Sequence, residues 1–243
     1  MGVPNMFNDI IQKHLNVFAA WVPIVNQFNL GDYGIFADGV FSKLGNITDD
    51  FKVTFKEGVG SEADIDFTSE GATVVKLGGN ATVDVAAAGQ VKAGIQITFS
   101  KEKSFLVKSP KITVKTIENV NALSKLLKAT GAWDGQWKVV HQVYNAIDAI
   151  IVSTIEKGTK LDFTGEASLI GDMKLGGVGV NVDTNKALGL KINGKNGVIG
   201  LGLFRIKSKI FGGSKVLIMG DGDRGDDDMP IFLDPQEVPG DDV

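Results

Sequence analysis

The fold is decided by residues 137–155, which read WKVVHQVYNAIDAIIVSTI. In an extended chain, successive side chains point to opposite faces, so a strand that is apolar at both phases is covered on both sides. One phase of this segment carries Val139, Val143, Ile147 and Ile151, and the other carries Val140, Tyr144, Ile150 and Val152. These β-branched and aromatic residues predict one long strand that is buried on both faces.

The chain on either side of this strand alternates between apolar and polar residues with a period of two, which predicts further strands. The alternating segments are 51–56, 63–67, 81–85, 91–99, 161–169, 178–183, 188–192 and 199–206. We expect Gly89 in a hairpin turn between the third and fourth of these, and residues 193–197 in a tight turn before the last. A phase slip at Leu203 and Phe204 predicts a β-bulge.

Helical spacing occurs in two places. Apolar residues recur every three or four positions at Phe7, Ile10, Ile11, Leu15 and Phe18, which predicts an amphipathic first helix that ends before Pro23. A turn-rich loop carrying Tyr33, Ile35 and Phe36 is expected next. A second helix is predicted over residues 120–127, with Asn119 as its N-cap and Gly131 at its end. The fold class is therefore α+β: a twisted, mainly antiparallel sheet with an N-terminal amphipathic helix and a few further helices.

The composition removes several classes of function. Cysteine is absent from the 243 residues, which excludes thiolate nucleophiles and cysteine zinc sites. The two histidines, His14 and His141, lack metal-site spacing, and Gly176, Gly177 and Gly179 lie among strand residues rather than between a strand and a helix. We therefore expect no enzyme activity, no cofactor, no metal and no nucleic-acid partner. The N-terminus lacks the order of a secretory signal, so we expect a cytoplasmic protein.

The charge is divided unevenly along the chain. Residues 221–243 contain nine acidic residues and one arginine, a net charge of −8, whereas residues 1–220 contain 24 basic and 20 acidic residues, a net charge of +4. We divide the chain into a body, residues 1–215, and an acidic, flexible tail, residues 216–243. The tail either competes for the charges of the body or serves only solubility. Ile231, Phe232 and Leu233 offer a short apolar anchor for it.

The order of these elements over residues 5–210 resembles the pore-forming domain of the gasdermins. The similar features are the amphipathic first helix, the Val22–Val25 strand, the hairpin of residues 80–107 with its Gly89 turn, the strand of residues 137–155 containing VVHQVY, its Lys157 and Gly158 tip, and the closing segment LKINGKNGVIGLGLFRI from Leu190 to Ile206. The short length and the missing cysteine make the chain most similar to short fungal members, which regulate cell death in non-self recognition.

This resemblance implies a gasdermin-like fold that binds acidic lipids, oligomerises and inserts β-hairpins, about residues 73–108 and 139–185, into a membrane barrel. The implied lipid contacts are Lys13, Tyr33, Ile35, Phe36, Lys43, Lys191, Arg205, Lys207 and Lys209. The implied membrane-facing residues are Val91, Ala93, Ile95, Ile97 and Phe99 in one hairpin, and Ile147, Ala149 and Ile151 in the other.

The resemblance also implies partners and a route. The partners would be acidic membrane lipids, further copies of the chain or a divergent allelic partner, and in some relatives an activating protease. The protein would move from the cytoplasm to the plasma membrane on activation and kill its own cell. Without the resemblance, the alternation alone favours an ordinary half-exposed sheet over membrane-facing strands, and the alternative function is a soluble all-β module that binds an apolar ligand or a partner protein.

Overall fold

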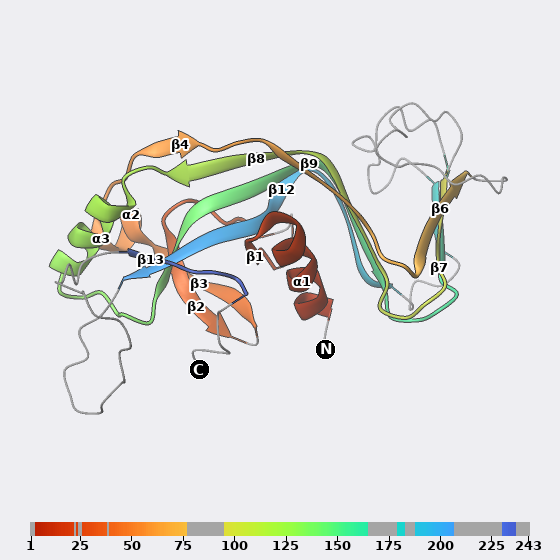
Figure 1. Cartoon of the computed structure of the whole chain (residues 1–243), viewed down its shortest axis with the longest axis horizontal. Coiled ribbons are helices and arrows are strands. Elements are labelled where there is room, and N and C mark those ends of the chain that lie inside the picture. The colour runs from red at the N-terminus through yellow and green to blue at the C-terminus, as the bar shows by residue number, and fades with distance from the viewer. Residues whose placement is uncertain are drawn as a thin grey trace, which may run out of the picture.

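The computed structural model describes residues 3–21, 23, 26–37, 39–76, 95–164, 179–182, 188–206 and 230–236. The molecule is elongated, with a large antiparallel sheet along most of its length and a small sheet at one end (Figure 1). The first helix, α1 (Val3–Leu15), lies below the large sheet in that view. The predicted α+β class, mainly antiparallel sheet with few helices, is confirmed.

The strand β9 (Lys138–Thr154) is the centre of the large sheet. One of its edges pairs with β12 (Leu188–Ile206) along its whole length, from Lys138 opposite Arg205 to Thr154 opposite Leu188. The other edge pairs with β8 (Phe105–Ile117) and, beyond the end of β8, with β2 (Asp32–Ala37). The prediction of a long strand buried on both faces is confirmed, because β9 has partners on both edges and a mostly buried surface.

Shorter strands complete the large sheet. β3 (Val40–Asn46) pairs with β2, β4 (Glu57–Val59) and β5 (Ala63–Thr68) pair with β8, and β1 (Phe18–Ala19) and β13 (Pro230–Phe232) pair with β12. The small sheet contains β6 (Ala72–Lys76), β7 (Ile95–Phe99), β10 (Lys160–Thr164) and β11 (Gly179–Val182) in the order β11-β10-β7-β6.

Three helices pack against the large sheet. α1 (Val3–Leu15) buries Phe7, Ile10 and Ile11 in a cluster with residues of β5, β8, β9 and β12. α2 (Ile47–Phe51) and α3 (Val120–Ala129) lie together at the end opposite the small sheet, where Leu123 and Leu127 join a second cluster (Figure 1). The amphipathic first helix is confirmed, but it ends at Leu15 rather than near Pro23, and Phe18 begins β1.

Three local predictions were wrong. Residues 51–56 do not form a strand, because the Asn46 side chain accepts a hydrogen bond from the Thr48 backbone N–H and starts α2 there. The residues 193–197 do not turn, because β9 continues opposite them and keeps β12 extended. Asn119 does not cap α3 with its side chain; its Oδ1 accepts from the Lys56 backbone N–H at 2.7 Å instead. The bulge near Leu203 is confirmed by a register shift between Gly202 and Leu203.

The packing below α1 generates a stability prediction. Ile151 is fully buried on β9, whereas Ile155, four residues along the chain, is 45% exposed. We expect Ile151→Ala to lower the free energy of unfolding by about 2–5 kcal/mol, because it leaves a cavity in the core. The matched Ile155→Ala change should cost no more than about 0.5 kcal/mol. Urea denaturation followed by circular dichroism measures both, and equal losses would contradict the packing described here.

Candidate functional site

The bend between the two sheets is the candidate functional site. Along the chain, β5 leads into β6, β7 into β8, β9 into β10 and β11 into β12. The order across the large sheet is β5-β8-β9-β12, and the order across the small sheet is β6-β7-β10-β11. Each strand of the small sheet therefore continues a strand of the large sheet, so the two sheets are one four-stranded ribbon that is bent (Figure 1).

The hydrogen-bond register of the central pair is unchanged across the bend. Phe105 is opposite Ser153 where the large sheet ends, and Thr98 is opposite Lys160 where the small sheet begins. The intervening stretches, 99–104 and 154–159, are therefore equal in length, at six residues each. Backbone bonds persist at both ends of them, from Phe99 N to Thr159 O at 2.9 Å and from Thr154 N to Ser104 O at 3.0 Å.

The second pair is less regular. Ser153 is opposite Leu190 in the large sheet and Leu161 is opposite Val182 in the small sheet, but the register shifts next to the bend, where Thr154 is opposite Leu188. The outer pair differs further: three residues, 69–71, separate β5 from β6, but six residues, 100–105, separate the matching positions of β7 and β8. The central ladder could therefore become continuous without sliding.

Local hydrogen bonds hold the bend. The Thr154 and Thr159 hydroxyls lie 2.9 Å apart, and each also donates to the Glu156 carbonyl. The Ser104 hydroxyl donates to the Lys101 carbonyl at 2.9 Å, and Gly158 adopts a positive φ of 83° at the tip. Each such bond contributes only about 1 kcal/mol net, so the bend is a weaker feature than the ladders on either side of it.

The small sheet is apolar on one face and polar on the other. Ala72, Val74, Ile97, Phe99 and Leu161 are buried and lie on one face, because they pair directly with one another across the strands. The opposite face is mostly polar, with Thr73, Gln96, Thr98, Lys160 and Asp162 beside Val75, and the Gln96 amide donates to the Asp162 carboxylate at 2.7 Å. At the far end of β6, Lys76 is opposite Ile95 in the register of the apolar face. This alternation is typical of a strand pair with lipid on one side and water on the other, and equally of a half-exposed sheet.

A segment of the tail lies on the large sheet. β13 pairs with the end of β12, with Phe232 opposite Phe204, and the Leu233 backbone N–H donates to the Leu203 carbonyl at 3.0 Å. The Gln12 side chain of α1 donates to the Pro235 carbonyl at 2.9 Å. The apolar anchor of the tail, within residues 230–236, therefore lies on the body.

The ring of His141 packs against this tail segment. It lies 4.9 Å from the Phe232 ring and 6.0 Å from the Phe204 ring, both in edge-on geometry. Burial lowers the pKa of His141 to about 4, because the charged imidazolium loses its hydration among apolar neighbours. His141 is therefore neutral at physiological pH. Its surroundings are aromatic, with no acid–base partner near it among the hydrogen bonds and ion pairs of the described residues.

The predicted lipid contacts that the structure describes lie on four different elements, α1, β2, β3 and β12. Lys13 is exposed in the last turn of α1, Arg205 is exposed beside β13, and Lys191 lies on β12 opposite Val152. Lys43, on β3, pairs at 2.8 Å with the fully buried Asp32, so it balances an internal charge. Lys207 and Lys209 lie outside the described residues.

The expected loop around Tyr33 is a strand. Tyr33, Ile35 and Phe36 belong to β2, where Tyr33 and Phe36 are core residues and Ile35 is partly buried. Tyr33 packs against Trp137 at 4.9 Å between ring centroids and hydrogen bonds to Asp50; burial, ahead of that bond, raises its pKa. Pairing with β3 overrides the local turn signals. Tyr33 and Phe36 are thus not available at the surface in this conformation.

The predicted membrane-facing residues divide between the two sheets. Ile95, Ile97 and Phe99 are on β7 of the small sheet, whereas Ile147, Ala149 and Ile151 are on β9 of the large sheet, where Ala149 and Ile151 pack in the α1 cluster. Val91, Ala93, the Gly89 turn and the 81–85 strand lie outside the described residues. The described part of the arm pairs with residues 72–76 rather than with 81–85.

Other chemistry finds little support in the described residues. No group of histidine, aspartate or glutamate there could hold a metal ion, and no described helix is long and apolar enough to span a membrane. A cavity of about 510 Å³ lies between residues 26–30 and the large sheet and is lined by several carboxamides, among them Asn145 and Asn196. The chain matches no family model, and no curated protein matches it.

Sequence reasoning missed the bend itself. Its only local signals are the polar stretches at residues 100–104 and 155–159, which read as ordinary hairpin tips. The matching lengths of these stretches could have been found only with the strand pairing in hand, because register is a relation between distant segments.

The position of His141 generates a pH prediction. Its pKa is lower in the folded state than the ordinary value of about 6.5. The part of the folding stability that depends on a neutral His141 is therefore fully present above pH 6.5 and is lost as the pH falls toward 4. At pH 5 the loss should be about 2 kcal/mol. Because carboxylates also titrate there, the measurement is the difference between wild type and His141→Phe in urea denaturation at pH 7.5 and pH 5. Identical pH dependence in the two proteins would contradict the assignment.

Proposed function

We propose that this chain is a non-enzymatic, gasdermin-like pore former that binds acidic lipids, assembles into a ring and inserts its extended ribbon into the membrane. The observation that carries the proposal is the register that the β8–β9 and β7–β10 pairs share across the bend. Straightening the bend would join β8 to β7 and β9 to β10 into long hairpin strands without breaking these two ladders.

The face pattern supports the same motion. With the alternation continued through the bend, the buried face of Ile97 and Phe99 becomes continuous with Phe105 and Val107, which α1 covers in this conformation. Lys101 and Lys103 fall between them on that face. Long cationic side chains can reach headgroups from the edge of an apolar band, so these lysines would mark the level of the membrane surface.

Assembly follows from the cost of open edges in lipid. An unpaired strand edge in hydrocarbon leaves its backbone groups without hydrogen bonds, so the ribbon is tolerated there only within a closed barrel. The four strands alternate in direction, since each neighbouring pair is antiparallel. Copies joined side by side would therefore give an antiparallel barrel throughout. The partner would be the same chain or a divergent allelic copy, at the plasma membrane of the cell that the pore kills.

The tail would restrain this change. β13 covers the end of β12, and Gln12 joins it to α1, the helix that would have to leave the apolar face. The net charge of −8 in residues 221–243 would also be repelled by an anionic membrane surface. Removal by a protease and displacement by a partner would release the same contacts.

The rival function is a soluble binding module, and the cavity beside Asn145 is the observation that favours it. Dye release from acidic vesicles distinguishes the two functions, because such a module would bind its ligand and leave the vesicles intact.

The arm of β7 generates the central test. We expect Ile95→Lys to abolish dye release from acidic vesicles, because a lysine on the lipid face near the bilayer centre costs about 2–4 kcal/mol in each copy. The matched Thr98→Lys change lies on the opposite, polar face of the same strand and should leave most of the release intact. Normal dye release by a folded Ile95→Lys protein, or an equal loss of release in both variants, would contradict the placement of β7 in the membrane.

The tail generates a second test. A chain ending at Gly220 lacks β13 and the acidic residues, so it should bind acidic vesicles more tightly and release dye faster than the full chain. Raising the salt concentration should reduce the part of the difference in vesicle binding and dye release between the two chains that depends on charge. Phe232→Ala in the full chain removes the ring contact with His141 but no charge, and it separates the anchor from electrostatics. Unchanged binding and release after truncation would show that the tail does not restrain the body.

A further inference from the structure

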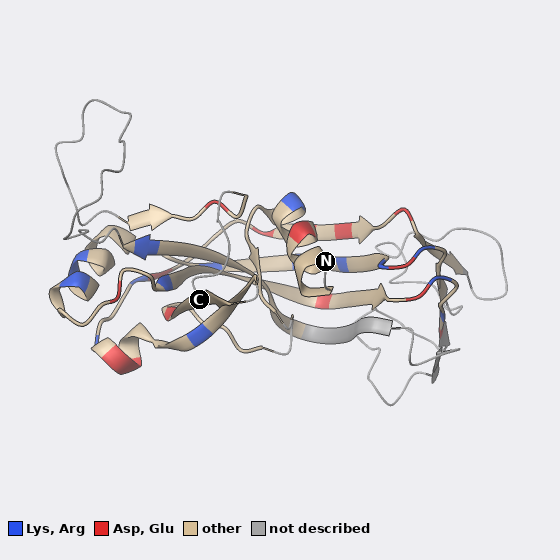
Figure 2. Cartoon of the chain, turned by 90° about the horizontal axis from the view of Figure 1, so that it is seen from below, with Lys and Arg blue, Asp and Glu red and all other residues tan. Residues whose placement is uncertain are grey.

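The ribbon has two open edges of opposite charge. β5 forms one edge, since β8 is its only strand partner among the described residues, and β12 forms the other, where its second edge is unpaired over residues 188–198 in that part of the chain. Figure 2 shows acidic residues of β5 in red along one margin of the sheet.

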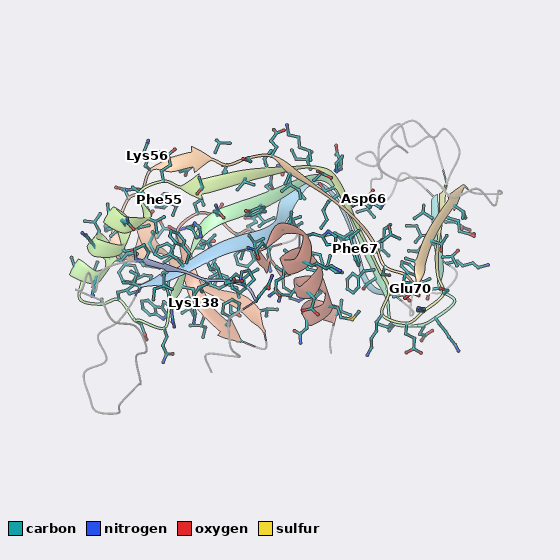
Figure 3. The ribbon with its side chains drawn as sticks, in the orientation of Figure 1. Phe55, Lys56, Asp66, Phe67, Glu70 and Lys138 are labelled. Atoms are coloured by element: carbon teal, nitrogen blue, oxygen red, sulfur yellow. The ribbon has the colours of Figure 1, made fainter. Side chains whose placement is uncertain are left out.

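The residues from 61 to 71 on the first edge include four acids and no basic residue. These are Glu62, Asp64, Asp66 and Glu70, and all four are exposed. Asp66 lies on β5 and Glu70 lies at the bend beyond it (Figure 3). The β12 edge, residues 188–206, contains Lys191, Lys195 and Arg205 and no acidic residue.

The lysines of β8 do not occupy the carboxylates of the β5 edge completely. Glu62 pairs with Lys111 and Asp66 pairs with Lys108, both across from β8, but their carboxylates remain 64% and 41% exposed. A carboxylate has two oxygens and about four acceptor positions, so it can accept from a lysine on each side. Asp64 is exposed and lies on the strand between them.

We infer that these edges form the contact between copies, with the β5 edge of one copy pairing with the β12 edge of the next; the inference rests on the proposed function. The charges repel at a β5–β5 contact and at a β12–β12 contact, and they attract only at a β5–β12 contact. A contact between two different surfaces repeats in one rotational sense and can close into a ring, whereas one like-with-like contact by itself gives only a dimer. The same charges thus oppose β5–β5 and β12–β12 pairing and favour β5–β12 pairing.

Direction is consistent with this contact. β5 and β12 run antiparallel within one ribbon, because three antiparallel pairings separate them. In copies related by rotation about a barrel axis, the β12 of one copy and the β5 of the next run antiparallel as well. No strand has to reverse for the backbone ladder to continue from copy to copy.

Charge reversal tests the contact by complementation. The first variant carries Glu62→Lys, Asp64→Lys and Glu70→Lys, which changes the net charge of residues 61–71 from −4 to +2, so both of its edges are basic. The second carries Lys191→Glu and Lys195→Glu, so both of its edges are acidic over the unpaired part of β12. Each variant alone should release dye from acidic vesicles at least about tenfold more slowly than wild type, because like charges then face each other at every contact of the ring. An equimolar mixture should recover to within about threefold of wild type, since alternating copies restore every pairing.

A control separates edge pairing from net charge. Lys52→Glu with Lys125→Glu makes the same charge change as the second variant at exposed positions on and beside the helices. Mixed with the first variant, it should not restore release. Co-sedimentation with vesicles verifies that each protein binds. Wild-type release by either edge variant alone, or a mixture that stays slow although both proteins bind, would overturn the inference.

A second readout is independent of leakage. A carbodiimide joins a carboxylate directly to an ammonium in contact with it, and a mixture of light and heavy isotope-labelled wild-type protein on vesicles marks links between copies by their mixed mass. Links between residues 62–70 and 191–195 with mixed labels support the edge contact. If wild type releases no dye, the pore proposal fails, and the edge contact stands or falls on these links alone.

Discussion

The backbone pairing of β9 along both edges is the constraint on which the rest of the structure depends. β12 covers one edge over its full length, and β8 and β2 divide the other between them. A strand paired on both sides cannot slide by one residue without turning every side chain to the wrong face. The position of α1, the place of the bend and the attachment of β13 are all defined relative to this fixed ladder.

The bend is the point at which this ladder changes direction. The chain changes direction between two regular sheets, yet it keeps equal numbers of residues on the central strands. Regular pairing is replaced there by short-range bonds of serine, threonine and glycine, such as those around Thr154 and Gly158. A cooperative ladder thus meets a small number of individually weak contacts, which is the arrangement from which a two-state change in shape can arise.

A sheet with open edges must remain soluble before it assembles. Charged edge strands oppose uncontrolled pairing, and the acidic β5 edge and basic β12 edge accomplish this while differing in sign. α1 covers an apolar face of the sheet, and β13 covers part of the β12 edge. Under the proposed function, solubility and assembly would depend on the same surfaces, and the tail segment contacts the body there through Gln12 and Phe232.

Local sequence determined those features whose cause is local. The two-phase apolar pattern of β9, the one-face pattern of α1 and the spacing of α3 each predicted their element, because burial of a face depends on periodicity alone. The tail anchor at residues 231–233 was also visible as an apolar island in an acidic segment.

Only the tertiary structure decided what depends on distant partners. Residues 193–197 carry strong turn signals but stay extended because β9 lies opposite them, and Tyr33 is buried because β3 and Trp137 enclose it. The register shared by the central strands of the two sheets and the opposite charges of the ribbon edges arise from segments up to 143 residues apart, from Glu62 to Arg205. Loop closure over such distances leaves no mark in the local pattern. The physical reason is that a hydrogen-bond ladder belongs to two strands at once, and neither sequence contains it alone.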